Sequence, residues 1–302
     1  MADILVRAGC YVSIIVLGYV LRRVGFLGPE TFGVLAKIVL KITLPAAIIT
    51  TSAGRALDAG LLSIVLLSLA ASAVYMAVGY LLNRKKGRGA QGFALVNFPG
   101  YNIGTFALPF TQSFLGPMGM IATNLFDVGN SFICLGGSYC IASSVKDGTG
   151  FSMKRIVKSA VTSVALMTHF LMVALNLAGL NLPQGVLSLA ELIGSANSVL
   201  AMLMLGVGMN LSGGSSRMRY IAKHLVIRYS MAAVFAAAFY FLLPFALEVR
   251  RALVILAFSP FASATPVFTE ELHEDRELSA TINSFSVVCS IVIIIGLLML
   301  ML

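Results

Sequence analysis

Ten stretches of apolar residues follow one another along the chain, with short polar segments between them. A helix needs about 20 mainly apolar residues to cross a bilayer, and each stretch is near that length. The pattern therefore predicts an all-α integral membrane protein with ten transmembrane helices, at residues 4–24, 32–53, 60–82, 90–115, 117–142, 156–179, 184–210, 220–245, 249–270 and 276–302.

Two of the predicted spans are interrupted by proline with small or polar neighbours. The fourth contains FPGYNIG at residues 98–104, and the ninth contains SPFASATP at residues 259–266. Proline removes a backbone donor and clashes with the preceding turn, so the helix opens there. The alternative is that these residues only kink their helices. We favour true breaks because both have polar neighbours and both lie at corresponding places in the two halves of the chain.

Five spans in each half, with one linker between them, give the halves opposite orientations. We therefore predict a first inverted repeat at residues 1–145, a cytoplasmic linker at 146–154 and a second inverted repeat at 155–302. Interrupted spans in matching positions of inverted repeats are typical of secondary transporters and mark their binding sites. The broken helices 4 and 9 are then expected to cross near the middle of the membrane.

The basic residues predict the orientation. With the N-terminus outside, all 21 lysines and arginines fall inside, Arg228 among them, except Arg7, Arg55, Arg250 and Arg251. Cytoplasmic loops carry an excess of lysine and arginine. We therefore expect a multi-pass protein of the plasma or inner membrane, with both termini outside. The acidic segment at 270–277 is discordant, but acidic residues weigh little in this rule.

Composition agrees with this interpretation. The chain is 59% hydrophobic and 11% charged, whereas soluble domains carry about 25% charged residues. Its partner is thus the lipid bilayer, and basic cytoplasmic loops explain the net charge of +9 without nucleic acid. The four cysteines all lie in apolar runs, which favours small buried hydrophobes over metal ligands or disulfides.

The breaks supply the candidate substrate site. A new half-helix begins after each break, and its first N–H groups have no partner within the helix and carry partial positive charge. Two such ends that converge suit an anion, most simply a carboxylate. The predicted substrate-binding residues are Pro99, Gly100, Asn102, Gly104, Pro260, Ser263, Thr265 and Pro266.

Polar residues at membrane depth supply candidates for coupling to H⁺ or Na⁺, with no other cofactor expected. Asp127 and Asn130 lie in span 5, Glu191 in span 7 and Asn283 in span 10. Ionisable residues inside a membrane are costly and are usually functional. For Asp127, a cation or proton site and a buried structural role remain equally open. For Glu191 and for His169 of span 6, a structural role is the favoured interpretation.

No catalytic constellation is present, and the sequence HEDRE at 273–277 lacks the second histidine of a metalloprotease motif. The chain is therefore not expected to be an enzyme or to hold a metal. A membrane sensor that binds a ligand without moving it is the other alternative.

Several motifs resemble those of one known family. They are GYVLRRVGFL at 18–27, LKITLPA at 40–46, NIGTFALPF at 102–110, GPMG at 116–119, LGVGM at 205–209 and PFASA at 260–264. In this order they resemble the auxin efflux carrier family, whose members include plant PIN carriers and bacterial permeases.

The resemblance implies a ten-span inverted repeat with crossed spans 4 and 9, elevator-type alternating access and a homodimer. It suggests small organic anions as substrates, with malate-like dicarboxylates plausible, and the layout is shared with sodium–bile-acid symporter-like proteins. Two departures are Ala107, where the family usually has glycine, and a first break that reads FPGYN instead of the plant carriers' NPNxY. Auxin itself is therefore not supported as the substrate.

Overall fold

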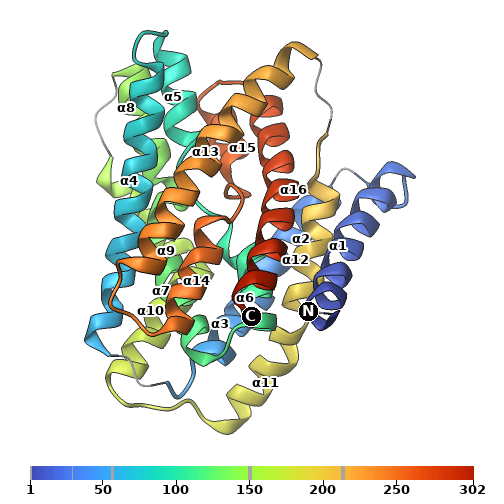
Figure 1. The fold of residues 1–302 in the computed structure, drawn as a ribbon, viewed down its shortest axis with the longest axis vertical. Coiled ribbons are helices and arrows are strands. Elements are labelled where there is room, and N and C mark those ends of the chain that lie inside the picture. Colours follow the sequence, from blue (N-terminus) through green and yellow to red (C-terminus); the bar gives the residue numbers. More distant parts are fainter. Residues whose placement is uncertain (1, 29, 56–57, 149–151, 212–214) are drawn as a thin grey trace.

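The computed structural model describes the chain except residues 1, 29, 56–57, 149–151 and 212–214. Within the described residues it is all helical (Figure 1). Seven helical segments are long and apolar enough to cross a membrane, or eight if one bent pair counts as a single span. The prediction of an all-helical, multi-pass membrane protein is confirmed.

Seven predicted spans are continuous helical segments, some of them composed of several elements. They comprise α1 (Ala2–Arg23); α2 (Thr31–Ile38), η1 (Val39–Thr43) and α3 (Leu44–Ser52); η2 (Ala59–Leu62) and α4 (Ser63–Asn83); α7 (Pro117–Phe132), η4 (Ile133–Gly137) and α8 (Ser138–Asp147); α11 (Gln184–Ser195) and α12 (Asn197–Gly208); α13 (Ser215–Phe241); and α16 (Arg276–Met301). The π-helical turn η1 lies just before Pro45, whose missing N–H interrupts the regular hydrogen-bond ladder.

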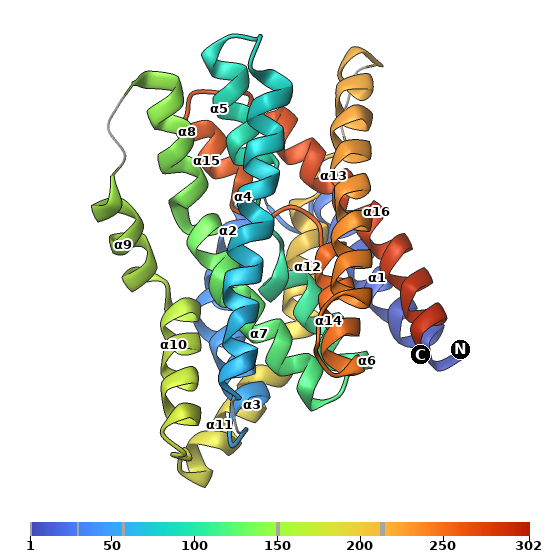
Figure 2. The same cartoon turned by 60° about the vertical axis from the view of Figure 1, so that its left-hand side comes forward.

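Predicted span 156–179 is a bent pair, α9 (Met153–Thr162) and α10 (Val164–Leu177), with 79° between the two helices (Figure 2). Ser163 lies at the bend with extended backbone, and its hydroxyl accepts a hydrogen bond from the Leu166 N–H. This side chain caps α10, so the bend is a true helix start and not a kink.

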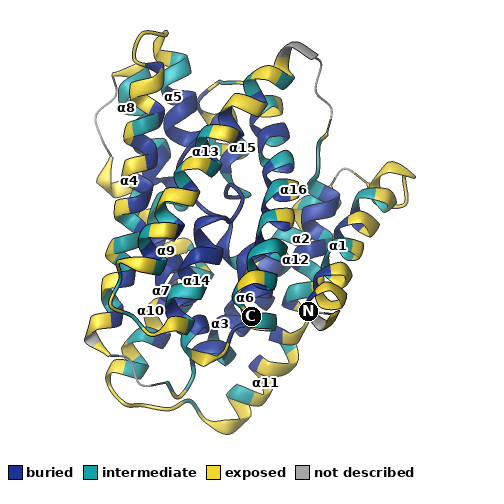
Figure 3. Cartoon of the chain, in the orientation of Figure 1, coloured by how far each residue is buried: buried dark blue, intermediate teal, exposed yellow. Residues whose placement is uncertain are grey.

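The two proline-containing spans stop and restart, as predicted. The first consists of α5 (Arg88–Asn97), the π-helical turn η3 (Ile103–Ala107) and α6 (Leu108–Phe114). The second consists of α14 (Leu247–Ala257) and α15 (Thr265–Glu271). We call residues 98–102 the first break and residues 258–264 the second break. Both lie in the buried interior, whereas exposed residues lie on the outside of the helices (Figure 3).

Charged residues from several elements meet around the segment between α15 and α16. The acidic segment between α15 and α16 is matched there by basic residues of other elements. Glu271 pairs with Arg155 of α9, Glu274 lies 2.6 Å from Lys146 of α8, and Asp275 lies 3.4 Å from Arg217 of α13. These pairs explain how an acidic segment lies among basic ones.

Helices α1 and α12 approach closely through glycine. A Cβ on Gly206 would come within 2.0 Å of the Ile15 carbonyl oxygen, and one on Gly18 within 2.5 Å of the Leu203 carbonyl oxygen. Both obstacles are backbone atoms, which cannot rotate away. Small residues let backbones approach in this way in membrane helix pairs.

Gly206→Ala is therefore expected to destabilise the protein by about 1–3 kcal/mol, the usual cost of overpacking. The measurement is thermal unfolding of the purified protein in detergent. Gly296→Ala is the matched control, because Gly296 is also helical but has nothing within 4 Å of its Cβ position. Equal melting temperatures for the two variants would contradict the close approach of α1 and α12.

Candidate functional site

The first break opens just after α5. Pro99 follows the end of the helix, and Gly100 has a φ of +84°, a conformation that side chains with a Cβ rarely adopt. A Cβ on Gly100 would also lie only 3.0 Å from the Cys134 Sγ. Glycine is thus required here by the backbone turn and by the contact with η4.

The second break lies against the first. The Asn102 N–H donates to the Pro260 carbonyl oxygen at 2.9 Å, and the Asn102 Nδ2 donates to the Ser263 Oγ at 2.8 Å. The Thr105 hydroxyl donates in turn to the Asn102 Oδ1. The two breaks therefore form one hydrogen-bonded unit, built by residues from both halves of the chain.

Polar side chains of the next predicted span hold each break: those of α7 hold the first break and those of α16 the second. Asn130 of α7 accepts from the Tyr101 N–H at 2.9 Å and donates to the Tyr101 carbonyl oxygen at 2.8 Å. On α16, Asn283 donates to the Ala262 carbonyl oxygen at 3.1 Å, and the Ser286 Oγ accepts from the Phe261 N–H at 3.2 Å. These side chains replace the partners that the opened backbone has lost.

Arg228 of α13 is the largest fully buried side chain in the described part of the chain, at 1% exposure. Its guanidinium donates to the carbonyl oxygens of Phe98 and Gly100, each at 3.0 Å. The same group lies 3.8 Å from the ring centroid of Tyr75 and 4.4 Å from that of Tyr101. One planar fork therefore caps two carbonyls of the first break while aromatic faces cover its charge.

This placement corrects the assignment of Arg228 to the cytoplasmic loops. Counting basic residues treats every arginine near a helix end as a loop residue, but Arg228 lies in the middle of a continuous apolar helix. Its depth in α13 was the available signal: an arginine at membrane depth is costly and indicates a buried function. Within the described residues, no carboxylate lies at ion-pair distance from it, so its positive charge is not cancelled by direct contact.

Asp127 of α7 is paired with His169 of α10. The His169 Nε2 lies 3.3 Å from the Asp127 Oδ2, and both side chains are nearly or fully buried. The Asp127 Oδ1 accepts from the Asn130 Nδ2 at 3.1 Å. The histidine is thus an interhelical partner, as favoured from the sequence.

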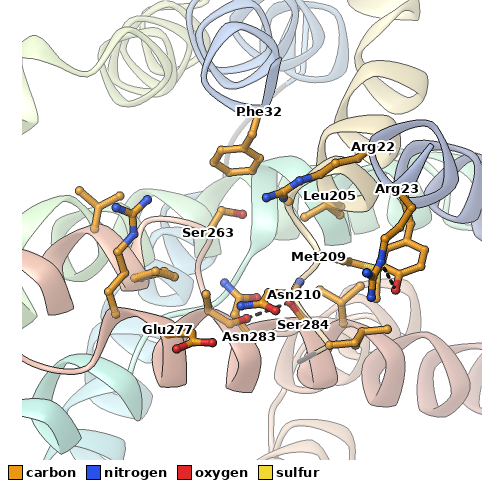
Figure 4. Close-up of a pocket in the computed structure, with 18 residues that line it drawn as sticks. Arg22, Arg23, Phe32, Leu205, Met209, Asn210, Ser263, Glu277, Asn283 and Ser284 are labelled. Carbon is orange, nitrogen blue, oxygen red and sulfur yellow. Dashed lines mark hydrogen bonds between the residues drawn. The ribbon is translucent and has the colours of Figure 1, made fainter. Parts of the chain in front are cut away.

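A cavity of about 740 Å³ opens beside the second break (Figure 4). It lies among the ends of α1 and α12, the start of α2, and α15 and α16. Its lining includes Ser263, Pro266 and Asn283 of the predicted set, together with Arg22, Arg23, Arg276 and Glu277. Figure 4 shows the Arg22 guanidinium directed into this space on the same side as Ser263. Asn102 is buried and reaches the cavity wall through Ser263.

The other predicted residues lie at different distances from this cavity. Pro99, Gly100 and Thr265 line a small void of about 10 Å³ between the breaks, and Pro260 is buried. A Cβ on Gly104 would come within 2.6 Å of the Leu44 side chain, so its small size serves packing against α3. Glu191 is exposed on α11, outside the group of residues around the breaks. Within the described residues, no three histidine, cysteine or acidic side chains lie close enough to hold a metal ion.

Comparison with known proteins gives one informative likeness. The chain is similar over most of its length to a protein of Methanothermobacter thermautotrophicus named an uncharacterized transporter. The two are 27% identical over 290 residues, which is 92% of this chain and 92% of that protein. No family model matches the chain.

Arg228→Met is expected to destabilise the protein, because two buried carbonyl oxygens lose their donor at a cost of roughly 1–3 kcal/mol each. Removal of a buried charge offsets part of this loss, so a net loss of about 2 kcal/mol is expected, or a melting temperature lower by roughly 5 °C. The measurement is thermal unfolding in detergent.

Arg219→Met is the control, since Arg219 lies on the same helix and is exposed. Arg228→Lys tests the forked geometry: one ammonium cannot reproduce the planar pair of donors, so it should recover only part of the loss. Arg228→Met at wild-type stability would show that the break does not need this cap.

Proposed function

We propose that this chain is a secondary-active or facilitative transporter of a small organic anion of the carboxylate class. The observation that carries the proposal is the cavity, whose lining runs from the arginines at the ends of α1 and α16 to Ser263 and Asn283. Ser263 accepts the bond from Asn102 that joins the two breaks, and Asn283 holds the second break. A solute in the cavity would therefore touch the residues on which the opened backbone depends. The relative from Methanothermobacter thermautotrophicus is named a transporter, which supports a transport function.

The charges around the cavity favour an anion. Three arginines and one glutamate line it, and guanidinium groups bind carboxylates with two parallel hydrogen bonds. Arg276 is engaged with Glu270 at 2.9 Å, and Arg23 is held on Tyr19 at 3.1 Å. Arg22 donates to the Val207 carbonyl oxygen and has further N–H groups that face the cavity. Arg22 is thus our candidate for the first contact with a carboxylate.

The arrangement of the breaks supports two inverted five-helix repeats. Asn130 holds the first break from the helix that follows it in the chain, and Asn283 does the same for the second. Similar contacts in the two halves are expected of duplicated halves. With the arginine-bearing ends of α1 and α16 in the cytoplasm, the cavity opens inward. Elevator-type movement would then carry the breaks to the other side, and a homodimer would supply a stationary frame.

Two alternatives lead to different experiments. A sodium-coupled carrier like the bile-acid symporters would need Na⁺ for flux. A ligand sensor would bind a carboxylate without moving it across proteoliposomes.

Asn102→Ala is expected to weaken binding of the substrate anion strongly, because it removes the side-chain amide that holds Ser263 on the cavity wall. The measurement is thermal stabilisation of wild type and variant by a panel of monocarboxylates, dicarboxylates, amino acids and indole acids, since a ligand raises stability according to its concentration over Kd. At a ligand concentration of 100 times Kd, the free energy of unfolding of the wild type should rise by about 2.7 kcal/mol. At the same concentration, that of Asn102→Ala should rise by much less.

Uptake of the carboxylate that stabilises best is then measured in proteoliposomes at equal amounts of reconstituted protein. Asn176→Ala is the matched control, because Asn176 also donates to a backbone carbonyl, that of Ser52, away from the breaks. Uptake by Asn102→Ala at the wild-type rate would refute the site, and stabilisation only by neutral or cationic solutes would refute the anion class.

Arg22→Gln is expected to weaken carboxylate binding by about tenfold, the loss of one charge-assisted contact of roughly 1.4 kcal/mol. The effect should appear in the half-saturation concentration more than in the maximal rate, since Arg22 lies at the cavity and not at the contact between the breaks. Arg7→Gln, at the other end of the same helix, should leave both unchanged. An unaltered half-saturation in Arg22→Gln would remove this arginine from the site.

A further inference from the structure

The pair Asp127–His169 is a carboxylate and an imidazole buried together at membrane depth. His169 is 2% exposed and the Asp127 side chain 11%, and neither lines the cavity. They belong to different helices, α7 and α10, and lie 3.3 Å apart. A carboxylate in this position is expensive unless it is paired or protonated. The substrate site described above does not account for either residue.

The pair is connected to the first break through one side chain. The Asn130 Nδ2 donates both to the Asp127 Oδ1, at 3.1 Å, and to the Tyr101 carbonyl oxygen, at 2.8 Å. The Asn130 Oδ1 meanwhile accepts from the Tyr101 N–H. Protonation of Asp127 would weaken its hold on Asn130, because a neutral carboxyl group is a poorer acceptor than a carboxylate. A proton on the pair therefore acts directly on Asn130, the side chain that holds the first break.

The surroundings of the pair leave little else to titrate. Helices α3 and α4 present neutral hydroxyls near α7, and the basic side chains of α9 are exposed. Glu248 of α14 binds the Gly119 N–H at the start of α7, two turns from Asp127. Among the described residues, the groups between the pair and the first break that can titrate or carry charge are Cys134 of η4, Tyr75 of α4, Tyr101, and Arg228 of α13; Arg250 and Arg251 lie on α14.

We propose that Asp127 and His169 form a proton-binding site that couples anion transport to the proton gradient, with one proton carried per cycle. This inference rests on the proposed function. With neutral histidine and ionised aspartate the pair carries one negative charge, and one added proton, shared between the Asp127 Oδ2 and the His169 Nε2, makes it neutral. The proton then stays on Asp127 while its helix moves, at lower electrostatic cost than an ionised carboxylate, and it leaves to water on the other side.

The test uses full-length protein in proteoliposomes with internal pyranine, and [14C]malate and [14C]succinate as probes. When the outside is one pH unit more acidic than the inside, wild-type protein should accumulate up to tenfold more malate inside the vesicles. One proton carried with each anion adds about 1.4 kcal/mol to the driving force. Asp127→Asn and His169→Gln should lose this accumulation and the malate-dependent proton entry seen by pyranine. They should retain exchange of internal for external malate at equal pH. Asp147→Asn and His273→Gln, the same changes at exposed positions, should behave as wild type.

Each outcome bears on one claim. Wild-type flux that ignores the pH gradient, or gradient-driven accumulation that survives in both pair variants, overturns the coupling site. Accumulation driven by a Na⁺ gradient and lost in Asp127→Asn would make the site a sodium site and overturn the proton. Absence of flux in wild type for malate, succinate and every carboxylate of the panel that stabilises the protein overturns the proposed function itself and the coupling with it. Loss of exchange in Asp127→Asn with normal exchange in His169→Gln would assign Asp127 to packing.

Discussion

Every feature of the site depends on how opened backbone finds hydrogen-bond partners where no water is available. An unpaired carbonyl or N–H at membrane depth costs several kcal/mol. Two breaks expose several such groups, and the protein pairs them with each other, as in the bond from Asn102 to Pro260, or with side chains. Arg228 pairs two of these groups, because one guanidinium reaches the carbonyls of Phe98 and Gly100 together, and Asn130 pairs two more on Tyr101. Without these partners the helices would close and the site would be lost.

The same solution also gives the site its charge. The Arg228 guanidinium supplies two N–H donors in one plane, but it also brings a full positive charge into the interior. Aromatic rings cover this charge, and no carboxylate of the described residues pairs with it. A charge acts more strongly in a low-dielectric interior than in water. A structural requirement of the break therefore adds a positive charge to the interior, in the same sense as the arginines that line the cavity and as the anion class proposed above.

Local rules of sequence were enough to predict the apolar helices and the places where two of them break. Proline without an N–H, glycine and the length of apolar runs are properties of single segments, so Pro99 and Pro260 were informative by themselves. The hydrogen-bond partners of the breaks could not be predicted in this way, because they come from residues about 30 to 130 positions away, such as Asn130 and Arg228. Asp127 was recognised as costly, but only the fold shows that His169 faces it. Glu191 is exposed on α11, a position compatible with the structural role that the sequence favoured for it.

The two breaks and the helices α7 and α16 that hold them are joined by hydrogen bonds. Each break is held by the helix that follows it, the first through Asn130 and the second through Asn283, while Asn102 and Ser263 join the breaks to each other. These bonds make the breaks and their supporting helices one mechanical unit, because separating any part would expose unpaired groups. Movement is cheaper where contacts are apolar and no hydrogen bond must break. The pair Asp127–His169 is different, since it is a polar contact between that unit and α10. Its strength depends on charge, so under the proposed proton coupling this contact would link protonation of Asp127 to movement of the unit past α10.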